Sequence, residues 1–453
     1  MSRWLYNDAM YRFNQPEPSY WEATAGEAET GATRLNNDEV CDVAIIGGGY
    51  TGLSAAYHLC RDHSADVRVL EAGHVGWGAS GRNGGFCSMG GDALGGERMV
   101  RKYGLDEARH YYASQVEAVE LVHSLIQDEN IDSPIQGDAE IAFACSPRHF
   151  EGLKAHAEFE CRELGLDTSV LTQEAVRERF LDSPLQHGAI MKRPTFGLHP
   201  MRYIRGLSAA AVRHGANVHE DHEIVEWTRD GDLHCLRSKR CSVRAKQVIL
   251  ATNGFLPEHL DQRFFGQVLP MISAIIVTRP MTEDERAAQA WQTECPTITA
   301  LNLLNYFRML PDGRFMFGGR GSANGNLGST AENFVKLRAR FHEVFPAWRD
   351  IQIDYQWHGL VCMTRRLTPG IGMIDDDPSI LFGFGYHGNG VNTATWAGQQ
   401  LAAWVGSGAK KMPATIPGVV HGLPGRIPLP GLRLQYIKAG IAIREFLDRR
   451  ITG

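Results

Sequence analysis

Three glycines in the first part of the chain have the spacing of a nucleotide-binding turn. Gly47, Gly49 and Gly52 form the motif G-x-G-x-x-G directly after the apolar run 43–46. The first glycine of such a motif permits a tight turn, the second lets a pyrophosphate approach the backbone, and the third lets a helix pack against a strand. Glu71 ends the next apolar run, where a carboxylate can accept hydrogen bonds from an adenosine ribose. These residues predict a site for a dinucleotide.

The loop after Glu71 indicates which dinucleotide binds. The motif alone fits both NAD and FAD, because both contain adenosine diphosphate. Residues 74–86, HVGWGASGRNGGF, are rich in small side chains, whereas an NAD domain normally continues here into a further strand–helix unit. A glycine-rich loop suits a flavin ring lying along the backbone, so we expect FAD. The predicted cofactor contacts in this part of the chain are Gly47, Gly49, Tyr50, Thr51, Gly52, Glu71, Ala72, Gly78, Ala79, Ser80, Arg82, Asn83, Gly84 and Gly85.

A second glycine-rich block lies late in the chain. Residues 383–400, GFGYHGNGVNTATWAGQQ, contain five glycines and lead into an apolar pattern with helical spacing. A turn that feeds a helix N-terminus offers free N–H groups and a favourable dipole to an anionic ligand. The buried-strand run 247–255 also ends in a turn. From these two segments we expect cofactor contacts at Thr252, Asn253, Gly254, Gly385, Gly388, Asn389, Gly390 and Val391.

The elements that position these residues change in type along the chain. Residues 42–73 give strand, turn, helix and strand, and residues 104–130 have the apolar spacing of an amphipathic helix. Residues 268–278 and 306–320 are typical of antiparallel strands, the second a hairpin that turns at Pro311-Asp312-Gly313. We therefore predict an α/β protein, α+β overall, with a discontinuous Rossmann-like FAD-binding domain and an inserted, mostly antiparallel substrate domain.

The predicted domain boundaries follow from that alternation. We expect an aromatic N-terminal arm over 1–38 and a C-terminal tail and helix over 411–453. The FAD-binding domain is predicted over 39–100, 186–255 and 355–410, and the substrate domain over 101–185 and 256–354.

Composition limits the partners and the compartment. The formal net charge of −6 gives no basic surface for nucleic acid, and nine scattered cysteines without CxxC spacing indicate neither a disulfide framework nor a metal site. No secretory pattern and no run of 18 apolar residues is present, so we expect a cytoplasmic chain without a transmembrane segment. The basic and apolar stretch 426–450 is read as a packed helix, with peripheral membrane contact as the alternative. The sequence leaves the oligomeric state open.

Six blocks of the chain, in order over residues 42–404, resemble one enzyme family. They include DVAIIGGGYTGLSAAYHL, LEAGHVGWGASGRNGG, VILATNGF, LPDGRFMFGGR, WHGLVCMTRRLTPGIG and GFGYHGNGVNTATWAGQQLA. The chain is identified as similar to the FAD-dependent amine and amino-acid oxidoreductases of the D-amino-acid oxidase superfamily. WGASGRNGG, the aromatic arm and the tail 426–450 look most like the gamma-glutamylputrescine oxidoreductase branch.

The resemblance implies a reaction. Family members oxidise the C–N bond of a small-molecule amine by hydride transfer to flavin N5, and water hydrolyses the imine; a secondary or substituted amine is the implied substrate. The late glycine block is implied to return to the N1–C2=O edge of the flavin. Sarcosine oxidases carry lysines that match Met316 and Asn392 here. Their absence makes a quinone or carrier, as well as O2, a possible electron acceptor.

Four residues are the catalytic candidates. Arg320 is expected on a strand above the ring to bind a substrate anion, with a charge at the cavity rim as the alternative. Arg82 is expected beside the flavin, with a structural salt bridge as the alternative. Tyr386 or His387 is expected to face the substrate, or else to be packed in the core. The weaker candidates from the paired strand are Tyr306 and Arg308.

Cys362 leaves the mode of FAD attachment open. It lies in a segment resembling the one in which sarcosine oxidases bond cysteine to flavin, but a small buried hydrophobe is the ordinary role of cysteine. We expect non-covalent FAD, with a covalent link as the alternative.

Other functional classes stay open. They are a D-amino-acid or sarcosine/glycine-type dehydrogenase with a quinone or carrier acceptor, a flavin monooxygenase, and a flavin subunit of a hetero-oligomer. The chain shows no second G-x-G-x-x-G motif for NADPH, which disfavours the monooxygenase.

Overall fold

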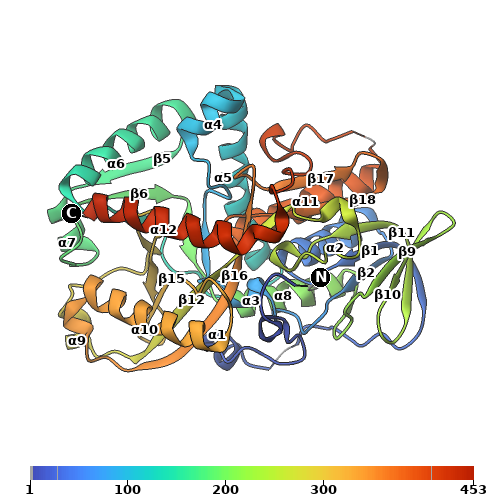
Figure 1. The fold of residues 1–453 in the computed structure, drawn as a ribbon, viewed down its shortest axis with the longest axis horizontal. Helices are drawn as coiled ribbons and strands as arrows, with labels where there is room; N and C mark the ends of the chain where they lie inside the picture. The colour runs from blue at the N-terminus through green and yellow to red at the C-terminus, as the bar shows by residue number, and fades with distance from the viewer. Residues whose placement is uncertain (1–3, 28, 410, 453) are drawn as a thin grey trace.

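Two large sheets organise the computed structural model, which describes residues 4–27, 29–409 and 411–452 (Figure 1). The first sheet has a parallel centre, with an antiparallel edge strand on one side and a hairpin beside β11. Its strands in spatial order are β17 (Gly370–Ile374), β18 (Asp377–Phe384), β11 (Ser242–Leu250), β1 (Glu39–Ile46), β2 (Val67–Leu70) and β8 (Asn217–His219), with β10 (Leu233–Arg237) and β9 (Glu226–Asp230) as the hairpin. Parallel strands covered on both faces are continuous apolar runs, which explains the sequence of β1.

The second sheet is antiparallel except for one parallel pair, β13 with β4. Its strands in order are β16 (Ile353–Thr364), β12 (Val268–Pro280), β15 (Arg314–Arg320), β14 (Tyr306–Met309), β13 (Thr297–Thr299), β4 (Glu140–Phe143), β6 (Ala189–Arg193) and β5 (Asp167–Leu171). A small pair, β3 (Phe86–Ser88) and β7 (Thr195–Gly197), lies apart from both sheets. The predicted fold class, a Rossmann-like unit with an inserted antiparallel unit, is confirmed.

Strand pairing modifies the predicted domain ranges at two places. β6 and β16 fall within ranges that the sequence assigns to the FAD-binding domain, yet both strands pair within the second sheet. The sequence could not show this, because β4 and β12, which are antiparallel partners of these two strands, are distant in the chain and no local pattern indicates which strands pair. The domain division as a whole stays a prediction.

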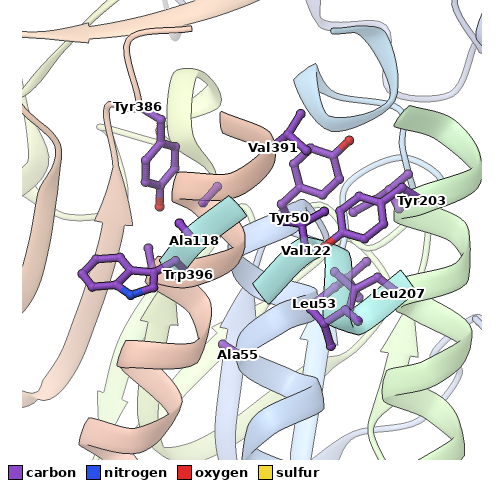
Figure 2. Close-up of a cluster of buried hydrophobic side chains, with 14 of the residues drawn as sticks. Tyr50, Leu53, Ala55, Ala118, Val122, Tyr203, Leu207, Tyr386, Val391 and Trp396 are labelled. Atoms are coloured by element: carbon purple, nitrogen blue, oxygen red, sulfur yellow. The ribbon is translucent and has the colours of Figure 1, made fainter. Parts of the chain in front are cut away.

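Helices from distant parts of the sequence cover the first sheet. α2 (Tyr50–His63) packs between α8 (Pro200–Arg213) and α11 (Gly390–Ser407), and α11 also contacts α5 (Leu105–Asp128). Figure 2 shows the buried cluster at this junction, with Leu53, Tyr203 and Trp396 drawn from three of these helices. The remaining helices are α1 (Tyr20–Thr24), α3 (Ala79–Arg82), α4 (Gly96–Tyr103), α6 (Pro147–Phe159), α7 (Gln173–Arg179), α9 (Glu283–Ala287), α10 (Leu327–Val344) and α12 (Arg433–Thr452).

The two faces of the second sheet have different roles. Phe307, Phe315 and Phe317 pack into an aromatic core with Phe341 of α10 and Trp348. Because side chains alternate between the faces of a strand, the residues between these phenylalanines point the other way. That second face is turned toward the glycine-rich loop after Glu71.

Both chain ends pack on the body of the protein. In the N-terminal arm, Tyr6 donates its hydroxyl to Pro270 O at 2.7 Å and Glu17 pairs with Arg82. α12 crosses the front of the molecule in Figure 1 and is fixed at its start by the Arg433–Glu258 ion pair. No helix among the described residues is long and apolar enough to cross a membrane.

Candidate active site

The predicted nucleotide turn joins β1 to α2 in a geometry that requires glycine. Gly47 has φ +106°, and a Cβ there would lie 2.9 Å from Ala251 O. A Cβ on Gly52 would lie 2.0 Å from Gly47 O. The turn therefore brings the N-terminus of α2 against the end of β1, as a pyrophosphate site requires.

The Glu71 carboxylate is held by backbone donors at the end of β2. Its Oε2 accepts the N–H of Gly48 at 2.7 Å, and its Oε1 accepts the N–H of Gly73 at 2.9 Å. Burial raises the pKa of Glu71 even though both hydrogen bonds favour the charged form. The side chain is thus oriented beside the turn, where it lines the cavity described below.

The loop after Glu71 folds back onto the start of α2. Ser80 Oγ accepts the N–H of Tyr50 at 3.1 Å, and the Tyr50 hydroxyl donates to Ser80 O at 2.7 Å. Asn83 donates from Nδ2 to the same carbonyl and accepts the N–H of Gly85. These bonds fix the loop as one wall beside the nucleotide turn.

The turn after β11 supplies a further polar wall. Asn253 has φ +46°, and its Oδ1 accepts the N–H of Gly385 at 2.9 Å. The neighbouring Thr252 Oγ1 is buried without a hydrogen-bond partner among the described residues. A buried hydroxyl without a partner is unusual, and Thr252 lines the cavity, so a bound ligand would satisfy it.

The late glycine block brings the N-terminus of α11 to the same place. Gly388 has φ +109°, and within the described chain the N-cap Asn389 makes no side-chain capping bond. Its Nδ2 instead donates to Met89 O at 3.1 Å and Gly90 O at 2.5 Å. The first N–H groups of α11 are therefore left for an electron-rich ligand edge.

His387 has both ring nitrogens engaged by the backbone. Nδ1 donates to Gly91 O at 3.2 Å, and Nε2 accepts the N–H of Thr364 at 3.2 Å. Burial lowers the pKa of His387 to about 4. The neutral ring thus connects the late block to the loop at Gly91 and to the end of β16, and it also lines the cavity.

Tyr386 faces the helix junction with its hydroxyl. The Tyr386 hydroxyl lies 2.7 Å from Thr51 Oγ1 of α2, and the side chain is 2% exposed. Figure 2 shows its ring beside the buried cluster. Burial raises the pKa of Tyr386. Through its contact with Thr51, the residue packs the start of α2 against the late block.

A single cavity of about 710 Å³ joins these walls to the second sheet. All predicted cofactor residues line it except Gly52, Gly85, Gly254 and Gly385, whose backbones lie behind the wall. FAD fits the groups present: a glycine turn at a helix N-terminus, an oriented carboxylate at Glu71, and the unpartnered Thr252 hydroxyl. Its nucleotide half would lie against Glu71, and its ring would reach the second sheet.

Tyr306 forms the centre of the sheet wall. Its ring lies so close to two glycines that a Cβ would come within 2.2 Å of it from Gly318 and 3.0 Å from Gly84. Its hydroxyl is 2.8 Å from Ser273 Oγ, and burial raises the pKa of Tyr306 to about 12. Tyr306 therefore spans from the second sheet to the glycine-rich loop after Glu71.

The two arginine candidates both have acidic partners. Arg320 donates to Glu445 of α12 at 2.7 Å and lines the cavity. Arg82 is 6% exposed, donates from Nε to Trp77 O at 2.6 Å and pairs with Glu17 at 3.2 Å. Arg82 therefore ties the N-terminal arm to the loop after Glu71, and both arginines line the cavity.

Three further residues have well-defined surroundings. Arg308 is buried away from the cavity, donates to Gln136 Oε1 at 2.8 Å, and has a pKa lowered to about 9 by burial. Cys362 lines the cavity, and burial raises the pKa of its thiol. Met316 is fully buried on the cavity side of β15, with its methyl group beside Gly84.

Sequence reasoning missed several polar residues of the cavity wall, two of which come from the second sheet. Ser273 on β12 and Glu140 on β4 both line the cavity. Their strands contain no motif. Only the alternation of side chains between the two faces of each strand could have indicated that these two residues point away from the apolar core.

These features define a dinucleotide-dependent oxidoreductase, and comparison with known proteins identifies the kind. The family described as FAD dependent oxidoreductase matches residues 42–404. The chain belongs to this family, and its cofactor is FAD.

Two curated relatives match most of the chain. Gamma-glutamylputrescine oxidoreductase of Escherichia coli (strain K12) is 29% identical over 437 residues, which cover 95% of this chain and 98% of the relative. The probable oxidoreductase OrdL of Haemophilus influenzae is 29% identical, covering 81% of this chain and 83% of that protein. Glycine oxidase from Geobacillus kaustophilus shares the fold, with a TM-score of 0.70 and 19% identity over 86% of this chain and 100% of the other.

Proposed function

We propose that this protein oxidises the C–N bond of an amine related to gamma-glutamylputrescine, a polyamine- or amino-acid-derived compound. The observation that carries the proposal is the continuous cavity between the nucleotide turn and the polar face of the second sheet. The relative that is similar over almost the full length of both chains supports the substrate class.

Each wall of the cavity has a distinct task in this proposal. When bound, FAD supplies the acceptor for the hydride equivalent that leaves the C–N bond. The N-terminus of α11 stabilises negative charge at its end of the cavity. Tyr306 and Ser273 form a polar pair that orients the amine from the sheet, and Arg320 attracts an anionic group at the cavity edge.

The surroundings of the ring site favour an acceptor other than O2. Among the described residues no lysine lines the cavity, and Met316, which matches a lysine of sarcosine oxidases, is fully buried beside Gly84 rather than on the cavity wall. Asn392, the second such position, is buried, and within the described part of the chain neither its Nδ2 nor its Oδ1 forms a hydrogen bond. We propose that a quinone or carrier protein reoxidises the enzyme faster than O2.

We also propose that FAD is bound without a covalent link. The Cys362 thiol is buried and its pKa is raised, so the thiolate that attacks a flavin is disfavoured. A visible spectrum before and after acid precipitation tests this. Colour left in the supernatant supports non-covalent FAD, and colour in the pellet overturns it.

Anaerobic reduction tests the activity itself. The purified holoenzyme is mixed without oxygen with gamma-glutamylputrescine, putrescine, sarcosine, glycine or D-alanine, and loss of the flavin absorbance is followed. Reduction by gamma-glutamylputrescine or putrescine supports the proposal. Reduction by glycine or D-alanine alone contradicts the substrate class. Adding O2 or a soluble quinone to the reduced enzyme then compares the two acceptors.

A further inference from the structure

A carboxylate lies on the cavity face of the second sheet and the mechanism above leaves it unused. Glu140 begins β4 and lines the cavity. Its neighbour Ile141 packs in the aromatic core with Phe307, so the pleat turns Glu140 toward the opposite face. Ile298 of the adjacent strand β13 lines the cavity from that same face.

Among the described residues, the charge of Lys192 acts on Glu140 without forming an ion pair with it. Lys192 lies directly across on β6, but its Nζ donates to Glu160 Oε1 at 2.6 Å. That contact and His156 help to hold the pKa of Glu160 at about 2 against its burial. Arg98 of α4 reaches the cavity from an exposed position. Within the described residues Glu140 forms no ion pair, and burial raises its pKa.

A second carboxylate lies near Glu140. Ser88 of β3 and Asp92 both line the cavity, and the charge of Lys192 acts on Asp92 as well as on Glu140. Asp92 Oδ1 accepts the N–H groups of Leu94 and Gly95 at 2.9 and 2.8 Å, so Asp92 shapes the start of α4 and contributes its charge from there. Ser88 immediately follows the loop that carries the predicted flavin contacts. Ser88 hydrogen-bonds to the Glu140 carboxylate, but no described cation forms an ion pair with it. A carboxylate without an ion pair in a ligand cavity indicates a functional site.

We propose that Glu140 binds the ammonium group of the substrate, and that Glu140 together with Asp92 disfavours a carboxylate on the carbon next to that nitrogen. The inference rests on the proposed function and deepens it. It selects amines of the putrescine type over α-amino acids such as glycine or D-alanine, because an α-carboxylate would meet two like charges.

Two unreactive ligands of similar shape and opposite charge provide the test. The tert-butylammonium ion has no hydrogen on its α-carbon and cannot be oxidised, and pivalate is the matching anion. Equilibrium dialysis against the holoenzyme measures their dissociation constants. We expect tert-butylammonium to bind tighter than pivalate, and Glu140→Gln to weaken the cation by about tenfold or more while leaving the anion unchanged or tighter.

Matched variants separate this effect from general damage. Glu97→Gln removes an exposed carboxylate of α4 outside the cavity wall and should leave both constants unchanged. FAD content and the thermal midpoint report on folding; if Glu140→Gln does not fold, Glu140→Asp keeps the charge one methylene shorter and should give an intermediate loss. Equal cation binding in the native protein and a folded Glu140 variant overturns the proposal, as does tighter native binding of pivalate.

Substrate reduction gives an independent arm. Butylamine and norvaline differ by one carboxylate, and we expect faster flavin reduction by butylamine, with the ratio falling about tenfold or more in Glu140→Gln. A ratio that stays unchanged contradicts the selectivity. If neither compound nor any other amine reduces the flavin while cation binding still depends on Glu140, the proposed function fails and the binding site survives.

Discussion

Single polar side chains in the site act from fixed positions set by the backbone. The buried, neutral ring of His387 is held in place by one carbonyl and one N–H, and Glu71 is held by two N–H groups. Neither side chain can rotate without leaving a buried donor or acceptor unsatisfied, which costs about 1–3 kcal/mol. These side chains are therefore ordered during folding, so that a ligand does not have to order them when it binds.

At the residue scale, we expect the substitution Glu71→Gln to weaken the binding of FAD. The amide keeps one acceptor but places a donor near the N–H of Gly48 or Gly73, and the negative charge that would receive ribose hydroxyls is lost. We expect the dissociation constant of FAD to rise by about ten- to a hundredfold. Quenching of FAD fluorescence on titration with apoprotein measures it. Glu97→Gln is the control, and equal affinities in the three proteins would refute the role of Glu71.

At the scale of elements, the second sheet is packed against the glycine-rich loop after Glu71 through the Tyr306 ring. Gly318→Ala would push a methyl group into the Tyr306 ring, which already rests on Gly84. We expect unfolding to become easier by about 1–3 kcal/mol, because the packed ring has no free direction in which to move. Gly152→Ala is the matched control, since its Cβ meets nothing within 4 Å and lies in α6. Thermal unfolding of both variants decides; a Gly318→Ala midpoint at or above the native value contradicts the packing argument.

The attachment of α12 is a second prediction at this scale. Arg433 and Glu258 form a two-pronged pair at 2.5 and 2.8 Å, and their side chains are 10% and 13% exposed. Arg433→Gln leaves the Glu258 carboxylate without its partner, at a cost below the ~3–5 kcal/mol of a fully buried pair. We expect a lower thermal midpoint and faster proteolysis near the start of α12. Arg449→Gln, on the exposed face, should change neither, and an unchanged Arg433→Gln would show that other contacts hold the helix.

Across the whole molecule, buried neutral histidines make stability depend on pH. Burial lowers the pKa of His58, His222, His234 and His387 to about 4 and that of His199 to about 3. The unfolded chain binds protons at these sites below about pH 6.5. In that window the unfolded state holds more protons than the folded state, so stability rises with pH and is lost as the pH falls.

The thermal midpoint should therefore fall steadily between about pH 6.5 and pH 4. Each histidine contributes a slope of at most about 1.4 kcal/mol per pH unit in the free energy of unfolding. Differential scanning fluorimetry in matched buffers measures the trend, and His234→Gln should make it shallower. A midpoint that is flat from pH 7 to pH 4.5 would contradict the neutral state of these rings.

Local patterns were sufficient for the parts of the protein that are built from neighbouring residues. The turn at Gly47, the hairpin at Pro311–Gly313 and the long helix over 105–128 follow from glycine spacing, turn residues and apolar periodicity. These signals are reliable because each element forms its own hydrogen bonds within a short stretch of chain. FAD as the cofactor followed from the Gly47 turn together with the glycine-rich loop at 74–86, and family membership confirms it.

The tertiary structure decided which side chains meet across the cavity. Arg82 and Arg320 were plausible substrate ligands by sequence, but their partners Glu17 and Glu445 come from opposite ends of the chain. Glu140 lies in no motif and reaches the cavity because a pleat and seven strand pairings place it there. The sequence by itself determined the cofactor, since its binding turn is local. The charges that face the substrate depend on strand order and side-chain direction, which only the packed sheet sets.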